Sequence, residues 1–404
     1  ITKRLFIMSV ALIFQYDTSA SYFSTTDSLD FLKKRTFRFA SLLTEPICKA
    51  HELFRRLYLV DVLNPADSKT SNLARKFFIG IGFIICTFLS IGSTIPGAAL
   101  RGIVSYLEKE PFIYYQGKLP DKVLKNDFSL LSWNICCVGG GYPISDGGVM
   151  PWRFRIDKIV TKIAEKDPDI LSLYEVMDTA TGFYLYEKLQ EKYAHFYFNI
   201  GPRAIGPSSG VFVASKAEIK NPEFTPFPKQ MLVGRTKISE KGVFSFDIQI
   251  EGKKIKIHAT HLQDSEQPQY PVQEEINARQ AEMDLIIKKI HQETGNVILT
   301  GDLNLDNTEY AKSSWIGTFQ DLDFDENGSR TWGGDEFCAK MVGKRDSGPL
   351  NLDYTLITKK SKINGKTSLL ETGYDDTKFT IDALSDHRGL LSRFAMNTIN
   401  EEIE

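Results

Sequence analysis

The sequence lacks the features that mark several classes of protein. It has no internal repeat and no low-complexity tract, which argues against a solenoid or a largely disordered chain. Its five cysteines are odd in number and follow no zinc-ligand spacing, so neither a disulfide framework nor a structural zinc site is predicted. With 42% hydrophobic, 12% aromatic and 25% charged residues, the chain has the composition of a globular protein, not of a collagen or a polytopic membrane protein.

An excess of basic charge is also missing from most of the chain. Residues 127–404 carry 32 basic and 41 acidic side chains, whereas residues 1–126 carry 17 basic and 10 acidic ones. Binding to duplex nucleic acid depends on neutralising phosphates, so the acidic larger part argues against a nucleic-acid partner, and none is expected. The basic and apolar first part suits an anionic membrane surface instead.

Two apolar runs lie in this first part. Leu5–Phe14 follows two basic residues and is interpreted as either a signal peptide or a first membrane-contacting segment. Phe77–Leu100 has no charged residue over 24 positions, and as a helix of about 36 Å it would be long enough to cross a bilayer core of about 30 Å. Pro96-Gly97 is expected to break that helix, so a re-entrant or interfacial segment is weighed equally with a span, and a buried core helix is the third alternative. We expect a membrane-associated protein that contacts the bilayer through residues 77–100.

From about residue 127 the pattern changes to alternating strands and helices. Strands are predicted at Phe128–Asn134, Ile170–Glu175, Gly210–Ser215, Val243–Ile250, Lys254–Thr260, Val297–Thr300, Leu352–Ile357 and Leu390–Phe394. Amphipathic helices are predicted at Arg153–Lys166 and Glu274–Ile290, and a hairpin turn at Glu251-Gly252. Many strands with few long helices favour a two-sheet α/β sandwich over a doubly wound parallel sheet. We therefore predict a membrane-associated region at 1–126 and a catalytic domain at 127–398.

Polar and ionisable side chains stand at the ends of these predicted strands. They are Asn134, Glu175, His261, Asp302, Asn304, Asp353, Asp386 and His387. The ends of strands gather at one rim of a sandwich, so residues far apart in sequence can share a site. Taken singly, each has a structural interpretation, such as a solvated turn carboxylate for Glu175 or plain turn chemistry for Gly-Asp-x-Asn. His258 is expected at the surface and Asp264 as an ordinary loop carboxylate.

As a set, these residues have a chemical logic. Carboxylates and asparagine amides supply hard oxygen ligands, which suit Mg²⁺ better than zinc. Two histidines offer an acid and a base near neutral pH. A divalent ion and a histidine pair are what in-line attack of water on a phosphodiester requires, because the ion neutralises phosphoryl charge while the histidines deprotonate water and stabilise the departing oxygen.

The motifs, in order, are similar to those of the endonuclease/exonuclease/phosphatase superfamily over roughly residues 127–395. They are Trp133-Asn134, Glu175-Val176, Thr260-His261-Leu262-Gln263, Gly301-Asp302-Leu303-Asn304, Leu352-Asp353-Tyr354 and Ser385-Asp386-His387. Within the superfamily they most resemble the neutral sphingomyelinases, a likeness that Ser209-Gly210-Val211 and Glu240-Lys241-Gly242-Val243 strengthen. The resemblance implies a DNase I-like four-layer α/β sandwich and a Mg²⁺-dependent phosphoric diester hydrolase.

The resemblance also implies a role for each residue around the metal. Glu175 would be the principal Mg²⁺ ligand, with Asn134 close to the metal and the phosphate. Asp386 would be a further carboxylate on the metal side. Asp302 and Asn304 would orient the attacking water and hold a phosphate oxygen.

The remaining catalytic roles follow from the same resemblance. His387 would be the general base, oriented by Asp353, and His261 would stabilise the leaving alkoxide. Lys241 would be the lysine on the substrate side. The family usually places an aspartate five residues before that lysine, and this sequence has Thr236 there.

The function expected from the sequence is hydrolysis of a membrane lipid, sphingomyelin, to ceramide and phosphocholine. A DNase I-like nuclease shares the metal site, and a phospholipase C acting on another choline phospholipid shares the chemistry as well. A membrane-tethered module with a decayed site is the alternative that is not an enzyme. The complete set of polar residues argues against decay, because decay normally removes one or more of them.

Overall fold

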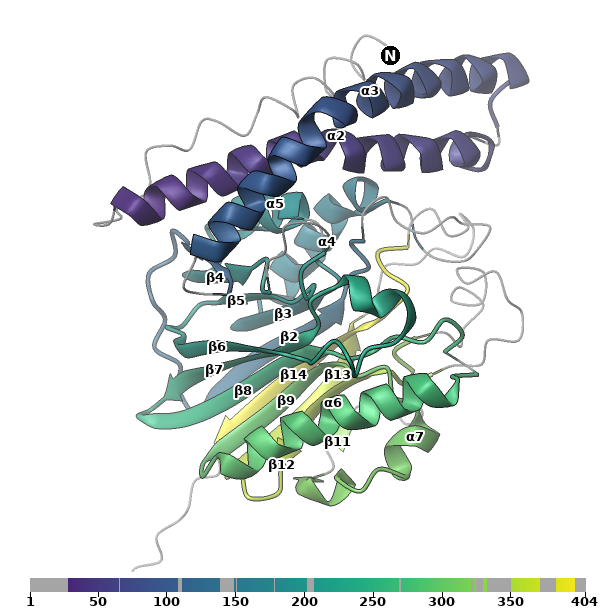
Figure 1. The fold of residues 1–404 in the computed structure, drawn as a ribbon. Coiled ribbons are helices and arrows are strands. Elements are labelled where there is room, and N and C mark those ends of the chain that lie inside the picture. The colour runs from purple at the N-terminus through teal and green to yellow at the C-terminus, as the bar shows by residue number, and fades with distance from the viewer. Residues whose placement is uncertain are drawn as a thin grey trace, which may run out of the picture.

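The structure is a computed structural model of the 404-residue chain, and it describes residues 28–64, 66–107, 111–138, 149, 151–177, 179–201, 207–268, 270–320, 323–324, 330–332, 350–370 and 383–396. Two β-sheets pack face to face, and helices cover the outer side of each sheet (Figure 1). The predicted two-sheet α/β sandwich is confirmed. A pair of long helices lies across the outer side of one helical layer (Figure 1).

The first sheet has eight strands. In spatial order they are β1 (Ile113–Gln116), β4 (His195–Phe198), β5 (Phe212–Ser215), β3 (Ile170–Tyr174), β2 (Asp127–Asn134), β14 (Gly389–Met396), β13 (Ile363–Leu370) and β11 (Asp323–Phe324). Helices α4 (Trp152–Lys166) and α5 (Thr179–Leu189) cover its outer face. β2 runs parallel to β3 and antiparallel to β14, so the ends of β2 and β3 meet the start of β14 at one edge.

The second sheet has six strands. In spatial order they are β10 (Phe319–Gln320), β12 (Asp353–Thr358), β9 (Asn296–Asp302), β8 (Lys253–His261), β7 (Gly242–Ile250) and β6 (Lys220–Pro226). Helices α6 (Gln273–Gln292) and α7 (Asn307–Ala311) cover its outer face, and two 3₁₀ helices, η3 (Gly234–Ile238) and η4 (Ile316–Thr318), lie in its connections. β8 runs parallel to β9, and β9 runs antiparallel to β12, so the ends of β8 and β9 meet the start of β12.

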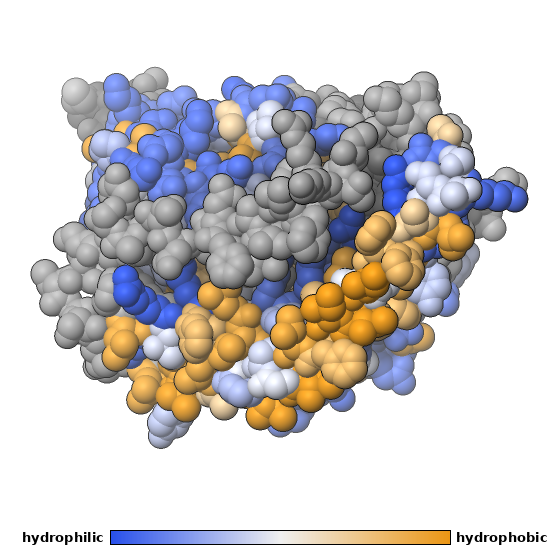
Figure 2. Space-filling model, turned by 90° about the horizontal axis from the view of Figure 1, so that it is seen from above, coloured by the Kyte–Doolittle hydropathy of each residue, from blue (hydrophilic) through white to orange (hydrophobic). Residues whose placement is uncertain are grey.

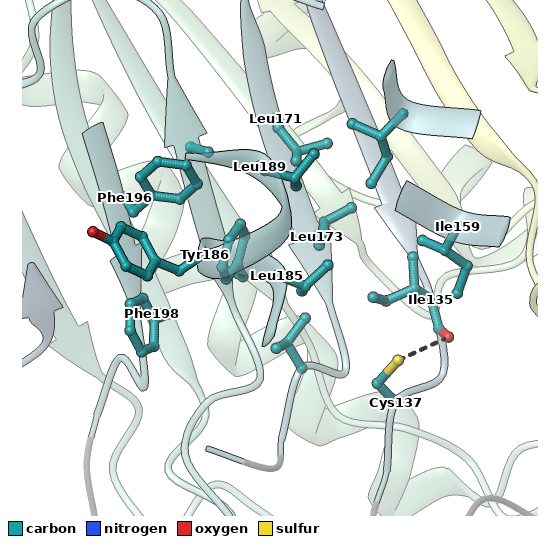
Figure 3. Close-up of a cluster of buried hydrophobic side chains, with 14 of the residues drawn as sticks. Ile135, Cys137, Ile159, Leu171, Leu173, Leu185, Tyr186, Leu189, Phe196 and Phe198 are labelled. Atoms are coloured by element: carbon teal, nitrogen blue, oxygen red, sulfur yellow. Dashed lines mark hydrogen bonds between the residues drawn. The ribbon is translucent and has the colours of Figure 1, made fainter. Parts of the chain in front are cut away.

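Each central strand is buried on both faces, which explains its nearly continuous apolar sequence. Along β3, Ile170 and Tyr174 pack between the two sheets, and Leu171 and Leu173 pack beneath α4 and α5. Figure 3 shows the second of these clusters, with helix side chains such as Leu185 against the strand residues. A third cluster fills the space between the second sheet and α6.

The predicted hairpin between β7 and β8 is confirmed. Glu251 and Gly252 have φ values of 48° and 78°, so both central turn residues are left-handed. A two-residue turn with two positive φ values matches the twist of the strands that it joins.

The domain division at residues 126 and 127 stays a prediction. β1 precedes this boundary in sequence, yet it pairs with β4 at the edge of the first sheet. The first apolar run, Leu5–Phe14, lies outside the described residues.

The pair of long helices is an antiparallel hairpin of α2 (Ser28–Leu63) and α3 (Lys69–Leu107). The expectation that Pro96-Gly97 breaks the helix is wrong, because α3 continues through both residues. Gly97 permits a close crossing: a Cβ atom there would lie 2.8 Å from the Cβ of Leu43 on α2. Among the described residues, only α3 is both long and apolar enough to cross a membrane, by length and composition alone.

The hairpin binds the layer of α4 and α5 through one region. Phe37 and Val104 join the apolar cluster beneath it, and Arg153 of α4 donates hydrogen bonds to Glu45 and, at 3.2 Å, to Glu52 of α2. Most of the rest of the hairpin leaves apolar side chains in solvent, and they form a band in the space-filling view (Figure 2). The band includes Phe77, Phe78, Ile84, Ile85, Phe88, Leu89, Ile91 and Ile95.

Replacing Arg153 with alanine is expected to loosen the hairpin. It removes two half-buried ion pairs, which we expect to be worth about 1 kcal/mol, so amide hydrogen exchange around Glu45 and Glu52 should become roughly fivefold faster. Exchange in α6, on the far side of the molecule, should not change. Lys162→Ala on the same helix removes only an exposed pair with Glu165 and is the matched control. If amide exchange in α2 is equally fast in wild type and Arg153→Ala, the ion pairs of Arg153 do not hold the hairpin.

Candidate active site

The first sheet brings three candidate residues to one edge. Asn134 ends β2 and is in register with Tyr174, the last residue of β3, so Glu175 follows immediately beside it. His387 precedes β14, and its backbone carbonyl accepts a hydrogen bond of 3.0 Å from the indole Nε1 of Trp133. The parallel pairing of β2 with β3 therefore places an amide, a carboxylate and an imidazole at the same rim.

The second sheet brings three more candidates to its own edge. His261 is in register with Asp302 at the ends of the parallel strands β8 and β9, and Asp302 is in register with Asp353 at the start of β12. Hydrogen bonds join the two rims: the Nδ2 amide of Asn134 donates to Oδ2 of Asp302 over 2.8 Å, and Nδ1 of His387 lies 2.8 Å from Oδ2 of Asp353. The structure thus gathers residues that are up to 253 positions apart, from Asn134 to His387, into a single site.

His387 is fixed by a carboxylate. Its Nδ1 lies 2.8 Å from Oδ2 of Asp353, and its Nε2 lies 3.7 Å from Oδ2 of Asp302. This geometry leaves Nε2 facing the centre of the site. The ligand atoms of Asp302, Asp353 and His387 all lie within 4.8 Å of one another, and among the described residues this is the one group of acidic, histidine or cysteine side chains close enough to hold a metal ion.

Glu175 has an unusual backbone and an unsatisfied side chain. Its φ is 60°, a left-handed conformation that costs a non-glycine residue about 1–3 kcal/mol. Gly210 makes room for it, since a Cβ at Gly210 would lie 3.2 Å from the Glu175 backbone. The buried Oε2 has no hydrogen-bond partner among the described residues, and neither has Oδ1 of Asp353. Buried carboxylate oxygens without partners are what a bound cation would satisfy, so the residues present fit a divalent metal.

Asn304 and Asp386 lie at the margins of this group. The backbone N–H of Asn304 donates to Oδ1 of Asp302 over 3.0 Å, and Asn304 is also left-handed, with a φ of 52°. Ser385 Oγ donates to the Asn134 carbonyl over 2.6 Å and lies 3.3 Å from Oδ1 of Asp386. These contacts tie the segment before β14 to the end of β2.

His261 and Lys241 are also buried. Both ring nitrogens of His261 are buried without a hydrogen-bond partner among the described residues, and Nε2 lies 3.6 Å from Oδ2 of Asp302. The ammonium of Lys241 donates to the Leu262 carbonyl over 3.1 Å. Burial lowers the pKa of His261 well below its usual value, and the neighbouring Lys241 charge lowers it further, so this imidazole is neutral.

The pKa values of the carboxylates and of His387 are all raised, but for different reasons. Burial raises the pKa of Asp302 to about 7, and burial together with the Asp386 charge raises the pKa of Glu175. Burial alone would lower the pKa of His387, but the charges of Asp353 and Asp302 outweigh it and hold that pKa well above the usual value. The site is therefore rich in negative charge that is not fully compensated.

Two supports of the site were missed by sequence reasoning. Arg155, inside the predicted amphipathic helix, is 1% exposed and donates to the carbonyls of Ile135 (2.8 Å), Cys136 (2.5 Å) and Leu384. It joins the segment after β2 to the segment before His387. A charged residue at an inward helix position is the one signal in the sequence that would have indicated it.

The second support is a buried charged face of α6. Arg279 donates to the Gln263 carbonyl (3.3 Å) and to Ser265 Oγ (2.8 Å), and Glu282 accepts the backbone N–H of Gln263 over 2.8 Å. Glu275 accepts a backbone N–H from the same loop. Their spacing of four and three residues places them on one face of the helix. This face fixes the loop that follows His261.

The prediction that His258 lies at the surface is wrong. The alternation of β8 predicted a surface side chain, yet His258 is 1% exposed, and its Nδ1 lies 2.8 Å from Ser245 Oγ. The prediction failed because α6 covers the outer face of the second sheet, so the polar side of the strand is also buried. Burial lowers the pKa of His258 to about 3.

Glu282 gives the protein a pH-dependent stability. Burial raises its pKa from 4.5 to about 8, so between these values the folded chain binds a proton that the unfolded chain has lost. This stabilising contribution is complete below pH 4.5 and is lost as the pH rises towards 8. Glu282→Gln keeps an acceptor for Gln263 and cannot ionise. We expect the variant to be more stable than wild type at pH 8 and similar at pH 4.5, measured by urea unfolding. Equal stability at pH 8 would contradict a buried, titrating Glu282.

The fold and the arrangement at its rim define a class of protein. The profile of the endonuclease/exonuclease/phosphatase family matches residues 131–387, and the chain belongs to that family. It is a hydrolase of the phosphodiesterase type, with a buried acidic cluster suited to a divalent metal.

Solved structures agree on the fold. Beta toxin from Staphylococcus aureus, a double mutant with bound magnesium ions, is 19% identical, with a TM-score of 0.54 over 66% of this chain and 99% of that one. Sphingomyelinase C from Streptomyces griseocarneus is 17% identical, with a TM-score of 0.50 over 66% and 99%. TDP2 from D. rerio, complexed with a single-stranded DNA product, is 16% identical, with a TM-score of 0.50 over 67% and 100%. A comparison with curated protein sequences gives no match.

Proposed function

We propose that this protein is a Mg²⁺-dependent phosphodiesterase that cleaves a membrane lipid, sphingomyelin, to ceramide and phosphocholine. The observation that carries the proposal is the pairing of His387 with Asp353 beside the oxygen-rich group of Asn134, Glu175 and Asp302. The apolar hairpin of α2 and α3 and the likeness to sphingomyelinase C support a lipid as the substrate.

Glu175, Asn134 and Asp386 are the residues that would hold the metal. Asp302, Asp353 and His387 also lie close together, but they are engaged with one another. Glu175 has an unpartnered buried oxygen, and Asp386 is the charge with the largest effect on it. Oxygen donors of this kind favour Mg²⁺ over softer metals. A bound divalent cation would supply positive charge that neutralises the phosphoryl oxygens and offsets the carboxylates around His387.

The remaining residues perform the proton chemistry in this proposal. Asp353 holds the imidazole of His387 so that Nε2 faces the site. The carboxylates around His387 raise its pKa, and a bound cation that offsets their charge would lower it again. The neutral imidazole then takes the proton of the attacking water. Asp302 and Asn304 orient that water and hold a phosphate oxygen. The water oxygen bonds to phosphorus on the side opposite the ceramide oxygen. The P–O bond to ceramide breaks with its electron pair on the ceramide oxygen, which takes a proton from solvent to leave as ceramide, and the proton on His387 returns to solvent.

Stabilisation of the leaving group falls to His261. As a neutral imidazole it carries one N–H, and neither ring nitrogen has a hydrogen-bond partner among the described residues, so the N–H is available to the departing alkoxide. Lys241 adds a positive charge on the substrate side of the same pocket.

The hairpin would bring the site to its substrate. Phe77–Leu100 is free of charge, but α3 packs along α2, which carries Lys49, Glu52 and Arg55. A helix with those charges is a poor membrane span, so we propose that the hairpin lies in the membrane interface and that residues 77–100 contact the lipid.

A substrate panel with and without Mg²⁺ tests the proposal. Vesicles of sphingomyelin, phosphatidylcholine and lysophosphatidylcholine are compared with plasmid DNA. We expect Mg²⁺-dependent release of phosphocholine, fastest from sphingomyelin. Folded protein that releases none from any of the lipids would overturn the proposal.

A nuclease is the second candidate, and the likeness to the TDP2 fold favours it. A nuclease needs a basic groove that follows the phosphates, whereas residues 127–404 have more acidic than basic residues. DNA nicking that His387→Ala abolishes, without lipid hydrolysis, would select this candidate.

A further inference from the structure

Lys241 is a buried ammonium with few direct contacts. The residue is 3% exposed, and among the described residues its ammonium donates one hydrogen bond, to the Leu262 carbonyl over 3.1 Å. A buried charge is costly unless an opposite charge compensates it. The carboxylates that act on this ammonium come from four segments, namely Asp264, Glu175, Asp302 and Glu282, and His261 is its neutral neighbour.

Asp264 has the strongest effect of these charges. It follows Leu262 by two residues, so the loop that accepts the hydrogen bond from Lys241 also supplies the carboxylate. The interaction is reciprocal, because Lys241 is the charge with the largest effect on Asp264. Burial would raise the pKa of Asp264, but Lys241 and the donors around the carboxylate outweigh burial and keep the pKa below its usual value.

A network of hydrogen bonds fixes the position of Asp264. Thr236 Oγ1 donates to its Oδ1, and Arg235 Nε donates to its Oδ2 over 3.0 Å. The Gln263 side chain donates to Thr236 Oγ1 over 2.8 Å and accepts the Val233 N–H over 2.9 Å. The 3₁₀ helix η3 and the loop after His261 are therefore locked together beside Lys241.

We propose that Asp264, held by Arg235 and Thr236, is a positioning residue that places the Lys241 ammonium on the substrate side of the active site. The catalytic role of Lys241 in this inference rests on the proposed function. The positioning of Lys241 by Asp264 does not depend on that function. Without the carboxylate, the bonds from Arg235 and Thr236 to this loop weaken, so the Leu262 carbonyl that accepts from the ammonium is no longer held in place.

The test measures Lys241 without any substrate. In protein labelled with ¹³C at lysine Cε, the Lys241 signal, assigned with Lys241→Arg, reports its pKa by NMR titration. Asp264→Asn is expected to lower that pKa by about one unit or more, a tenfold change in the equilibrium. Thr236→Val keeps the charge of Asp264 but removes one of its hydrogen-bond donors, so it is expected to lower the Lys241 pKa by a smaller amount. It provides a second measurement should Asp264→Asn not fold. A Lys241 pKa that neither folded variant lowers would overturn the proposal.

Kinetics then separate positioning from a general structural effect. Asp264→Asn is expected to lower kcat/KM at least about tenfold in wild type, mainly through KM, and to move the alkaline limb of the pH profile to lower pH. In a Lys241→Met background the same change should add little, because the partner is already gone. An equal loss in both backgrounds would overturn the positioning role. If no lipid is hydrolysed at all, the proposed function fails, while the NMR titration still decides the pairing.

Discussion

Replacing His387 with alanine is expected to lower the rate of phosphodiester hydrolysis by about 10²–10⁴-fold, the usual contribution of a general base. The imidazole is the one group in the described site that a carboxylate holds through one nitrogen while the other, Nε2, points towards Asp302 at the centre. The measurement is kcat with sphingomyelin vesicles at saturating Mg²⁺. Asp353→Asn should give a smaller loss, because it disturbs only the orientation and charge of the imidazole.

His291→Ala is the matched control for this experiment. His291 is an exposed histidine near the end of α6, so its loss should leave the rate unchanged. Near-ultraviolet circular dichroism confirms that each variant is folded. If His387→Ala keeps more than a tenth of the wild-type kcat, His387 is not the general base and the mechanism must be assigned to other groups.

The second large effect is expected at Glu175. Glu175→Gln keeps the size and shape of the side chain, yet it replaces an anionic oxygen, and Mg²⁺ affinity measured by calorimetry should fall by at least about 100-fold. The fold should survive, since burial already disfavours the charge at this position. The variant should also lose lipid hydrolysis.

Glu165→Gln is the control for Glu175, because Glu165 is exposed on α4 and away from the site. Both variants carry the same change in net charge. Unaltered Mg²⁺ binding by Glu175→Gln would remove Glu175 from the metal site. A protein that binds Mg²⁺ through Glu175 but hydrolyses nothing in the substrate panel would be the decayed module that the sequence left open.

Much of the fold was predictable because burial on both faces leaves a strong local pattern. Apolar runs such as Ile170–Glu175 gave the central strands within one or two residues of their observed bounds. Edge strands such as β1 and β6 went unpredicted, since their pairing partners and not their own sequences decide their structure. The break expected at Pro96 failed because packing against α2 outweighs the one backbone hydrogen bond that proline cannot make.

The candidate residues were found by their positions at strand ends, and the structure brings them together. The supports behind them were not visible in the sequence. Glu282 and Arg279 look like the polar side of an amphipathic helix, and only the tertiary fold turns that side inward against a loop. Asp264 was interpreted as a loop carboxylate for the same reason. The left-handed backbone of Glu175 leaves no sequence signature, because the glycine that permits it, Gly210, lies far away in sequence, in the segment before β5.

The bond between Asn134 and Asp302 bridges the seam between the two halves of the sandwich. Each half contributes part of the chemistry, and neither holds a complete set. A slip of a single residue along β9 would move Asp302 by about 3.3 Å and point it to the opposite face. Catalytic turnover by this protein therefore reports whether the two sheets have formed in the correct register. A chain with a shifted strand can be compact, keep its helices and still be inactive.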